Sequence, residues 1–414
     1  MTPPARLPRG LRPRGLPTHG GRALLGGRFA AAFASAVVAT GAGSRPAGLP
    51  PATGPVRVPY PAGDSVARVE VHADLGEADA VLAVLAERRA GRSVPDSLWA
   101  RLAATAGYRR LAARERAMGR PLGDSAFRAF VLSDALLARD SALAAAVVRW
   151  RTLDVTAPAR RALAYLPPGT ALRATLYPVI KPAPNSFVYD LAHDPAFFVY
   201  VDPAVGPAKL ENTLAHELHH VGYAAACGPA DAARDSALAR RTRRGGADSV
   251  AAARLGRALE WMSAFGEGLA MLAAAGGPDV HPHATSPDSD RARWDRDVTH
   301  VPADLPRLEA FFTAILDGRF ADGALATPEA IRRAGMGFFG VQGPWYTVGY
   351  VMARTVEVTD GRAALVAAEC DPRTFLAAYN AAAARANTRG ADGAPRLPTW
   401  SPALLARLGP STAR

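Results

Sequence analysis

The sequence predicts an α+β fold that is mostly helical and has a small sheet in its middle. From residue 69 to 164, apolar residues recur at intervals of three and four, as they do in amphipathic helices. Between residues 171 and 203, three short runs are rich in β-branched and aromatic residues and are bounded by Pro, Asn and Asp, which favours strands. Helical periodicity resumes at Pro207 and continues to the end, interrupted by an expected long loop from Gly276 to Pro302.

These patterns divide the chain into four segments. Within residues 1–43, a basic and acid-free leader is followed by the apolar stretch 29–39 and then by small residues. This order is typical of a secretory signal peptide and predicts export to the periplasm or the extracellular space. The basic part is unusually long, so two alternatives stay open: that the protein starts downstream of Met1, or that the segment is an organelle transit peptide. A Pro- and Gly-rich linker (44–68), a helical N-terminal region (69–165) and a region that holds the reactive motifs (166–410) follow.

The charge pattern does not favour nucleic acid as a partner. The formal net charge is +12, but half of it comes from six arginines in the leader, and the remainder is spread along the chain. The one dense cluster, Arg240 to Arg244, is expected to be a solvated loop. No apolar run approaches the roughly 18 residues that span a bilayer, so no stable membrane insertion is expected after signal removal.

The cysteine count limits the kind of metal site that the chain can form. Cys227 and Cys370 are the two cysteines, which excludes a Cys₄ or Cys₂His₂ zinc site, so any metal must be held by His and carboxylate side chains. In an oxidising compartment the two cysteines could form a disulfide, whereas a reducing compartment would keep them as free thiols. The sequence does not show whether they are close, so their pairing stays open.

A metal-binding motif lies in the segment from Thr213 to Tyr223, where HELHH matches the pattern H-E-x-x-H. Pro207 suits the first turn of a helix, and no helix breaker follows before Gly222. The motif is therefore predicted to lie on a helix that follows the short strands, which is the context that this motif needs.

The spacing of the motif assigns a role to each polar side chain. His216 and His220 lie one turn apart on the same helix face, from which both imidazoles can reach one zinc ion. Glu217 lies one step round the helix, where it can take a proton from the attacking water without binding the metal. His219 points away from the ligand face and is interpreted as a neighbour of the site.

A catalytic zinc site needs a third protein ligand, and the sequence after the motif lacks the closely spaced histidine of metzincins. A second apolar helix, predicted over Leu259–Ala275, carries Glu267 in its middle, and burial of a carboxylate there is costly unless it is paired or binds a metal. Glycines at 266 and 268 suggest that another backbone packs closely against it. Glu260, seven residues earlier on nearly the same face, is the rival ligand.

The HELHH motif followed by E-G-x-A resembles the gluzincin zinc peptidases and, more narrowly, bacterial families described only as zinc-dependent peptidases. The resemblance implies a Zn²⁺ cofactor, a thermolysin-like core and a peptide or protein substrate. It also implies that a strand edge lies beside the motif helix, for which Phe197–Val201 is the candidate. One position departs from thermolysin-like enzymes, because Met271 replaces the Asp that orients a zinc-binding histidine.

A donor to the oxyanion of the reaction is expected from the C-terminal half of the chain. Tyr346 and Tyr350 lie one turn apart on a predicted helix that begins at Gly343-Pro344. Family resemblance favours Tyr346, although aromatic residues at this spacing are more often part of a core. The histidines of the expected long loop are alternative donors, namely His281, His283 and His300.

These residues together predict zinc-dependent hydrolysis of peptide bonds, with Zn²⁺ held by His216, His220 and Glu267. Glu217 acts as general base and Tyr346 stabilises the oxyanion. Two alternatives stay open: a zinc-binding homologue without activity, and a helical interaction protein with a chance motif. The sequence leaves open the substrate, the choice between endo- and exopeptidase, and the oligomeric state.

Overall fold

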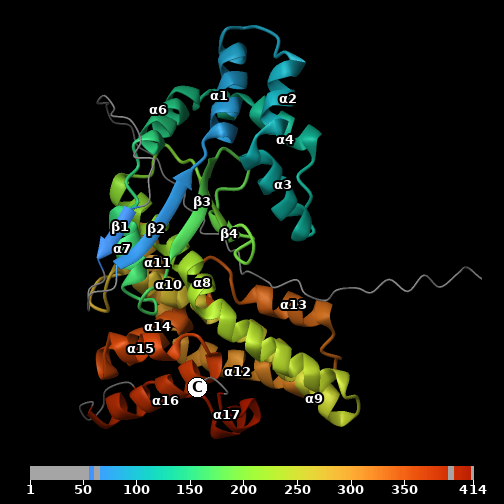
Figure 1. Ribbon diagram of the computed structural model, residues 1–414, viewed down its shortest axis with the longest axis vertical. Helices are drawn as coiled ribbons and strands as arrows, with labels where there is room; N and C mark the ends of the chain where they lie inside the picture. The colour runs from blue at the N-terminus through green and yellow to red at the C-terminus, as the bar shows by residue number, and fades with distance from the viewer. Residues whose placement is uncertain (1–55, 60–65, 390–395, 412–414) are drawn as a thin grey trace, which may run out of the picture.

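The fold consists of a mixed five-stranded sheet and two groups of helices (Figure 1). The computed structural model describes residues 56–59, 66–389 and 396–411. The strand order is β1-β2-β3-β5-β4, in which the inner pairs β2–β3 and β3–β5 are parallel and the two outer pairs are antiparallel. The described strands are β1 (Val56–Pro59), β2 (Val66–Ala73), β3 (Leu172–Val179), β4 (Phe187–Tyr189) and β5 (Ala196–Tyr200).

The helices form an N-terminal and a C-terminal group at opposite ends of the view in Figure 1. The N-terminal group consists of α1 (Gly76–Arg89), α2 (Asp96–Ala104), α3 (Ala106–Ala117), α4 (Asp124–Val131), α5 (Asp134–Leu137), α6 (Asp140–Arg151) and α7 (Thr156–Leu163). The C-terminal helices are α9 (Ala247–Met262), the 3₁₀ turn η1 (Ser263–Phe265), α10 (Gly266–Ala275), α11 (Asp288–Val298), α12 (Val301–Asp317), α13 (Pro328–Gly337), α14 (Pro344–Asp360), α15 (Arg362–Ala368), α16 (Pro372–Arg389) and α17 (Pro402–Leu408).

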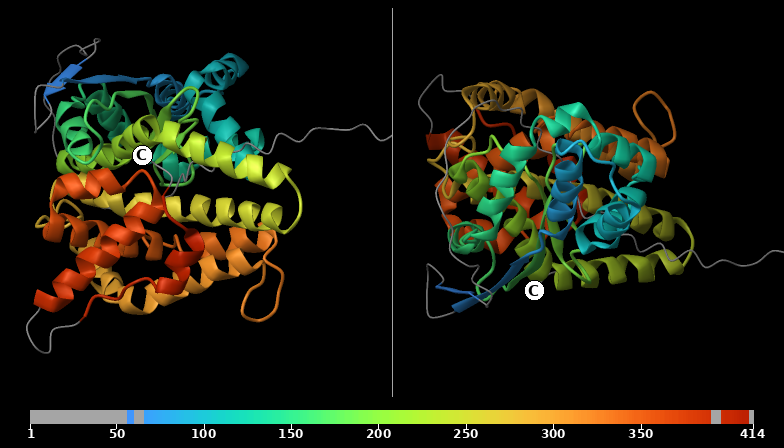
Figure 2. Two further views of the ribbon diagram at one scale, coloured as in Figure 1. Left: turned by 60° about the horizontal axis from the view of Figure 1, so that its bottom comes forward. Right: turned by 90° about the horizontal axis from the view of Figure 1, so that it is seen from above.

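The long helix α8 (Pro207–Arg243) runs between the two groups, as the turned view on the left of Figure 2 shows. Pro207 occupies its first turn, where proline is tolerated because a backbone N–H at this position would have no acceptor within the helix. The helix continues through Gly222, which lies so close to Leu166 and Leu172 that a β-carbon would overlap their side chains. Glycine therefore permits the close packing of α8 on the sheet.

Two hydrophobic clusters hold α8 in place. On one side, Leu214, Leu218 and Val221 belong to a cluster that includes the N-terminal helices and the core face of β3 and β5. On the other side, α8 packs on α9 and α10, whose apolar residues belong to the C-terminal cluster. The polar motif of α8 therefore lies where the two cores meet. None of the helices in the described ranges combines the length and apolar character needed to cross a membrane.

The α+β expectation is confirmed, and the three predicted strands are β3, β4 and β5. The sequence patterns missed β1 and β2, which occupy residues assigned to the linker and to the start of the helical region. β2 pairs with β1, which precedes it, and on its other side with β3, about 100 residues further along the chain. The second pairing joins β2 to the rest of the sheet, and a local pattern does not reveal it.

The expected free edge at Phe197–Val201 is wrong. These residues lie in and next to β5, which is flanked by β3 on one side and by β4 on the other. The edge strand is β4, because the chain reverses between Tyr189 and Ala196 and places β4 antiparallel on the outer side of β5. β4 also packs against α8, so the edge still lies beside the motif helix.

Three helix boundaries also differ from the sequence-based expectation. The expected loop from Gly276 to Pro302 contains α11 and the start of α12. The helix predicted over Leu259–Ala275 is interrupted by η1, so Glu267 lies in the first turn of α10 rather than in the middle of a helix. The arginines from Arg240 to Arg244 are solvated, but they form the end of α8 rather than a loop, where positive charge suits the helix dipole.

Candidate metal centre

Three side chains from two helices converge between the two cores. His216 and His220 come from α8, and Glu267 comes from α10. His216 Nε2 lies 3.1 Å from His220 Nε2 and 3.2 Å from Glu267 Oε2, while His220 Nε2 lies 3.4 Å from the same carboxylate oxygen. The three atoms therefore form a nearly equilateral triangle, and these are the three residues that the sequence predicts as metal ligands.

The size of this triangle fits a tetrahedral zinc ion. Ligand atoms about 2.0–2.1 Å from zinc at tetrahedral angles are roughly 3.3–3.4 Å from one another. Glu267 is only 2% exposed, and its second oxygen, Oε1, is buried with no hydrogen-bond partner. A buried carboxylate oxygen without a partner is costly. A cation held by the three side chains would neutralise this buried carboxylate, so the residues present fit Zn²⁺.

The electrostatics of the three groups favour an ionised carboxylate. Burial alone would raise the pKa of Glu267, but the charge of His220 and the contacts with both imidazoles lower it to about 2. Glu267 also lies in the first turn of α10, where the helix dipole stabilises negative charge. Glu267 therefore offers an anionic oxygen beside two imidazole nitrogens, a donor set that could hold a metal ion.

Close packing of two helix backbones places α10 against α14. A β-carbon at Gly268 would overlap the backbone of Gly349 and Tyr350, and one at Gly349 would lie 2.6 Å from the carbonyl oxygen of Phe265. Gly266 has open space instead, with nothing within 4 Å. The sequence suggested close backbone packing at both glycines that flank Glu267. Gly268 packs closely in this way and Gly266 does not.

Glu260, the rival third ligand, lies away from the histidines. It belongs to α9, before the 3₁₀ turn, and its side chain is exposed. Its backbone carbonyl accepts a hydrogen bond from Ser263 Oγ within that turn. The turn changes the helix path between the two glutamates, so Glu260 and Glu267 no longer share a face.

Glu217 lies next to the three ligand residues but faces a cleft. Both Glu217 and His216 line this cleft. Burial raises the pKa of Glu217 to about 8, although the charge of His220 opposes this shift. A carboxyl group beside a metal centre and open to a cleft can exchange protons with a bound substrate and water.

Of the two candidate tyrosines, Tyr346 lies at the site. Its ring stacks on that of His216, with centroids 6.4 Å apart and an angle of 17° between the planes. Its buried hydroxyl has no hydrogen-bond partner; Glu267 is near enough to raise its pKa but does not form a hydrogen bond of normal geometry with it. Burial is the larger cause of the raised pKa, so the hydroxyl stays protonated and able to donate. Tyr350 packs edge-on against Trp294 instead.

The histidines of the expected long loop have different environments. His281 pairs with Asp295 near the surface, and His300 is exposed at the start of α12. His283 is buried and lines the cleft together with His216. Sequence reasoning treated His283 as a loop residue and missed Lys209 and Gln342, which line the same cleft. The seven-residue spacing from Lys209 to His216 was a signal, because it places both on one face of α8.

No Asp equivalent replaces Met271 as a partner of the histidines. Met271 lines the cleft, and its sulfur lies 3.9 Å from Gln342 Nε2. Within the described part of the chain, Glu267 is the one carboxylate that contacts His216 or His220. The two imidazoles are therefore oriented by Glu267 and by helix packing rather than by an additional acid.

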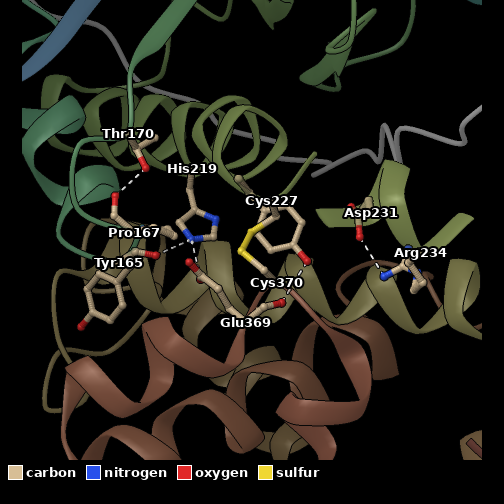
Figure 3. Close-up of a disulfide and its surroundings, with 10 residues drawn as sticks. Tyr165, Pro167, Thr170, His219, Cys227, Asp231, Arg234, Glu369 and Cys370 are labelled. Atoms are coloured by element: carbon tan, nitrogen blue, oxygen red, sulfur yellow. Dashed lines mark hydrogen bonds and ion pairs between the residues drawn. A yellow bond between two sulfur atoms is a disulfide. The ribbon is translucent and has the colours of Figure 1, made fainter. Parts of the chain in front are cut away.

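His219 is fully buried on α8 close to a disulfide, with its ring directed toward Tyr165 and Glu369 (Figure 3). Its Nε2 lies 3.3 Å from the Tyr165 carbonyl oxygen and 4.0 Å from Glu369 Oε2. Glu369 precedes Cys370, whose sulfur is bonded to that of Cys227 on α8. The cysteine pairing that the sequence left open is thus a disulfide between α8 and the segment joining α15 to α16.

Two histidines one helical turn apart, a carboxylate from a second helix and an adjacent acid together define a metal centre of the zinc peptidase class. The model of the family described as "Putative zinc dependent peptidase (DUF5700)" matches residues 154–388. Because this match covers more than half of the chain, the protein belongs to that family. The matched range includes α8, α10 and α14 and therefore the whole metal centre. No curated protein and no solved structure gave a significant match.

Proposed function

We propose that this member of the family is a zinc-dependent hydrolase of peptide bonds, in which His216, His220 and Glu267 hold the metal. The observation that carries the proposal is the triangle of three ligand atoms with edges of 3.1–3.4 Å, one of which belongs to a buried carboxylate with an unpartnered oxygen. A zinc ion held by these three side chains would supply Lewis-acid chemistry and would lower the pKa of water.

The side chains around the metal centre supply the proton transfers and the hydrogen bonding. Glu217 takes the proton of the attacking water and passes it to the leaving amine, which requires a carboxyl group open to the cleft. Tyr346 would donate a hydrogen bond from its hydroxyl to the developing oxyanion while keeping its proton, because burial raises its pKa. His216 and His220 remain neutral ligands.

We place the protein among the gluzincins, since the third ligand is a glutamate from a second helix beyond the HELHH motif. A thermolysin-like core requires a sheet edge beside the motif helix, and β4 packs against α8 at the edge of this sheet. Pro184 and Ser186, which immediately precede β4, line the cleft. An extended substrate would therefore lie along β4 and could pair with it by strand addition.

Metal analysis combined with a peptide-library cleavage assay tests the proposal. Wild-type protein is expected to bind about one zinc ion per chain and to lose its cleavage activity on chelation. Glu217→Gln should abolish cleavage while keeping the zinc, because Glu217 is assigned as base and not as ligand. Bound zinc without cleavage by the wild type would indicate an inactive homologue, and absence of zinc would indicate a chance motif.

We further propose that the protein is exported and that the mature chain begins between Gly41 and Ser44. The leader lies outside the described residues, so the proposal rests on its basic, apolar and small-residue order. The Cys227–Cys370 disulfide supports it, because disulfides persist in oxidising compartments. N-terminal sequencing of protein from a cell-envelope fraction tests this proposal. An intact Met1 in a cytosolic pool would contradict it.

A further inference from the structure

Three polar side chains line the cleft beside His216 without a full set of partners. Lys209, His283 and Gln342 lie in the same cleft as His216 and Glu217. His283 Nε2 and Gln342 Oε1 are buried atoms without a hydrogen bond of normal geometry, although the amide is near enough to His283 to affect its pKa. Buried polar atoms are rarely left unpaired unless a ligand, ion or water completes them.

The contacts of Ser286 determine where His283 carries its proton. Lys209 Nζ donates to Ser286 Oγ over 2.6 Å, and Ser286 Oγ lies 3.1 Å from His283 Nδ1. We assign the Ser286 hydroxyl proton to His283 Nδ1, while a lone pair of the same oxygen accepts from the lysine. Burial, followed by the charge of Lys209, lowers the pKa of His283 to about 3, so the ring is neutral. With this assignment the ring proton is on Nε2, a buried atom of a residue that lines the cleft.

Lys209 is a basic group of the cleft, and burial lowers its pKa while the charge of Asp290 raises it. Within the described ranges Lys209 forms no ion pair, because nearby Asp290 is paired with Arg293 at 3.0 Å. Asp202, another acid of the cleft, lies 3.5 Å from Arg139. The wall of the cleft next to the metal centre therefore combines a basic amine with an unpaired N–H donor.

Gln342 contributes a side-chain amide to the cleft, and its backbone has an unfavourable conformation. Its φ is 61°, in the left-handed region that non-glycine residues rarely adopt, and it is 5% exposed. Such strain persists at positions where the surrounding structure requires the side chain. A half turn of the amide exchanges its oxygen and nitrogen, so the unpartnered position can hold either a donor or an acceptor.

We propose that Lys209, His283 and Gln342 form a subsite that binds a carboxylate group of the peptide substrate, a preference that rests on the proposed peptidase function. Seven helical residues place Lys209 about 10 Å from His216 along α8. An extended peptide covers about 3.3–3.6 Å per residue, so the bound carboxylate lies within about three residues of the scissile bond. It belongs either to an acidic side chain or to the peptide C-terminus.

Matched pairs of peptides distinguish the two sources of carboxylate. A peptide that the wild type cleaves is prepared with Glu or Gln at each of the three positions on either side of the scissile bond. A second series ends in a free carboxylate or an amide at the same distances. Removing the recognised charge should lower kcat/KM by roughly tenfold to a hundredfold, mainly through KM, as expected for loss of a charge-assisted hydrogen bond.

Lys209→Gln should abolish this discrimination, whereas Arg116→Gln, which removes one charge from an exposed position on α3, should preserve it. Gln342→Gly keeps the backbone conformation accessible and should weaken the preference without loss of zinc. The peptide pairs are also titrated against zinc-loaded Glu217→Gln, which reports binding without turnover. Equal affinity and equal kcat/KM for every pair would overturn the subsite, whereas failure of the wild type to cleave any peptide would instead refute the peptidase proposal.

Discussion

Glu267 is the residue on which the candidate metal centre most depends. Its carboxylate oxygen Oε2 lies 3.2 and 3.4 Å from the two imidazole nitrogens, and its side chain is almost fully buried. An ionised carboxylate in an apolar helix is unfavourable unless a cation or hydrogen bonds compensate for its lost solvation. A metal site would explain why this carboxylate is buried, and replacing Glu267 is therefore expected to weaken metal binding.

Replacing each of the two candidate glutamates distinguishes the ligand from its rival. Glu267→Ala should weaken zinc binding by more than about tenfold, whereas Glu260→Ala should leave the affinity nearly unchanged. The physical reason is that Glu260 is exposed on α9, before the 3₁₀ turn. Titration of each protein with a competing chelator measures both affinities. The opposite ranking would mean that the metal lies elsewhere.

The two tyrosines of α14 allow a similar comparison for the oxyanion donor. Tyr346→Phe should reduce kcat by about 10²–10³ with little change in zinc affinity, because the lost hydrogen bond forms with the reacting oxygen. Tyr350→Phe keeps its contact with Trp294 and should retain most activity. Steady-state kinetics on one peptide measures both variants. Equal kcat values for the two would remove Tyr346 from the catalytic group.

At the scale of the elements, the site depends on how α10 packs against α14. The two helices approach at Gly268 and Gly349, one residue from Glu267 and three residues from Tyr346 respectively. The same crossing therefore positions the third ligand and the proposed oxyanion donor. Because packed interiors transmit small displacements, an added methyl group at the crossing should move both side chains.

Alanine substitutions at the two flanking glycines test this coupling. Gly268→Ala should lower the free energy of unfolding by about 1–3 kcal/mol through overpacking and should weaken zinc binding. Gly266→Ala, where the added methyl group meets nothing within 4 Å, should do neither. Urea unfolding and chelator titration measure the two effects. A stable Gly268→Ala protein with unchanged zinc affinity would show that α10 and α14 can move apart at this crossing without disturbing the site.

At the scale of the whole molecule, the disulfide connects the motif helix to the C-terminal helices. Cys227 lies two turns after His220 on α8, and Cys370 lies between α15 and α16, 143 residues further along the chain. The two hydrophobic clusters otherwise meet through packing around α8. A crosslink over so long a loop removes much of the entropy of the unfolded chain.

Reduction of the disulfide should therefore destabilise the protein. The free energy of unfolding is expected to fall by about 2–5 kcal/mol when the wild type is reduced, and the Cys227→Ala/Cys370→Ala variant should show the same loss without reductant. Denaturant unfolding at a fixed zinc concentration measures both proteins, and reductant should not alter the double variant further. Identical stability of the oxidised and reduced wild type would contradict this role of the crosslink.

The sequence alone determined the features that depend on local periodicity and residue chemistry. The spacing of four residues between His216 and His220 places them on one face because a helix has 3.6 residues per turn. The buried carboxylate in an apolar segment indicated Glu267 as a ligand, since such a group needs a counter-charge. The short aromatic runs predicted β3 to β5 in the same way.

Tertiary packing decided what depends on contacts between distant segments. β2 forms by pairing with β3, β4 rather than β5 becomes the edge, and the 3₁₀ turn separates Glu260 from Glu267. Likewise, only folding brings Cys227 to Cys370, and brings His283 and Gln342 into the cleft beside Lys209. The physical reason is that these arrangements arise from packing energies summed over the whole core; for β2 with β3, for the disulfide and for the cleft, no short window of sequence contains both partners.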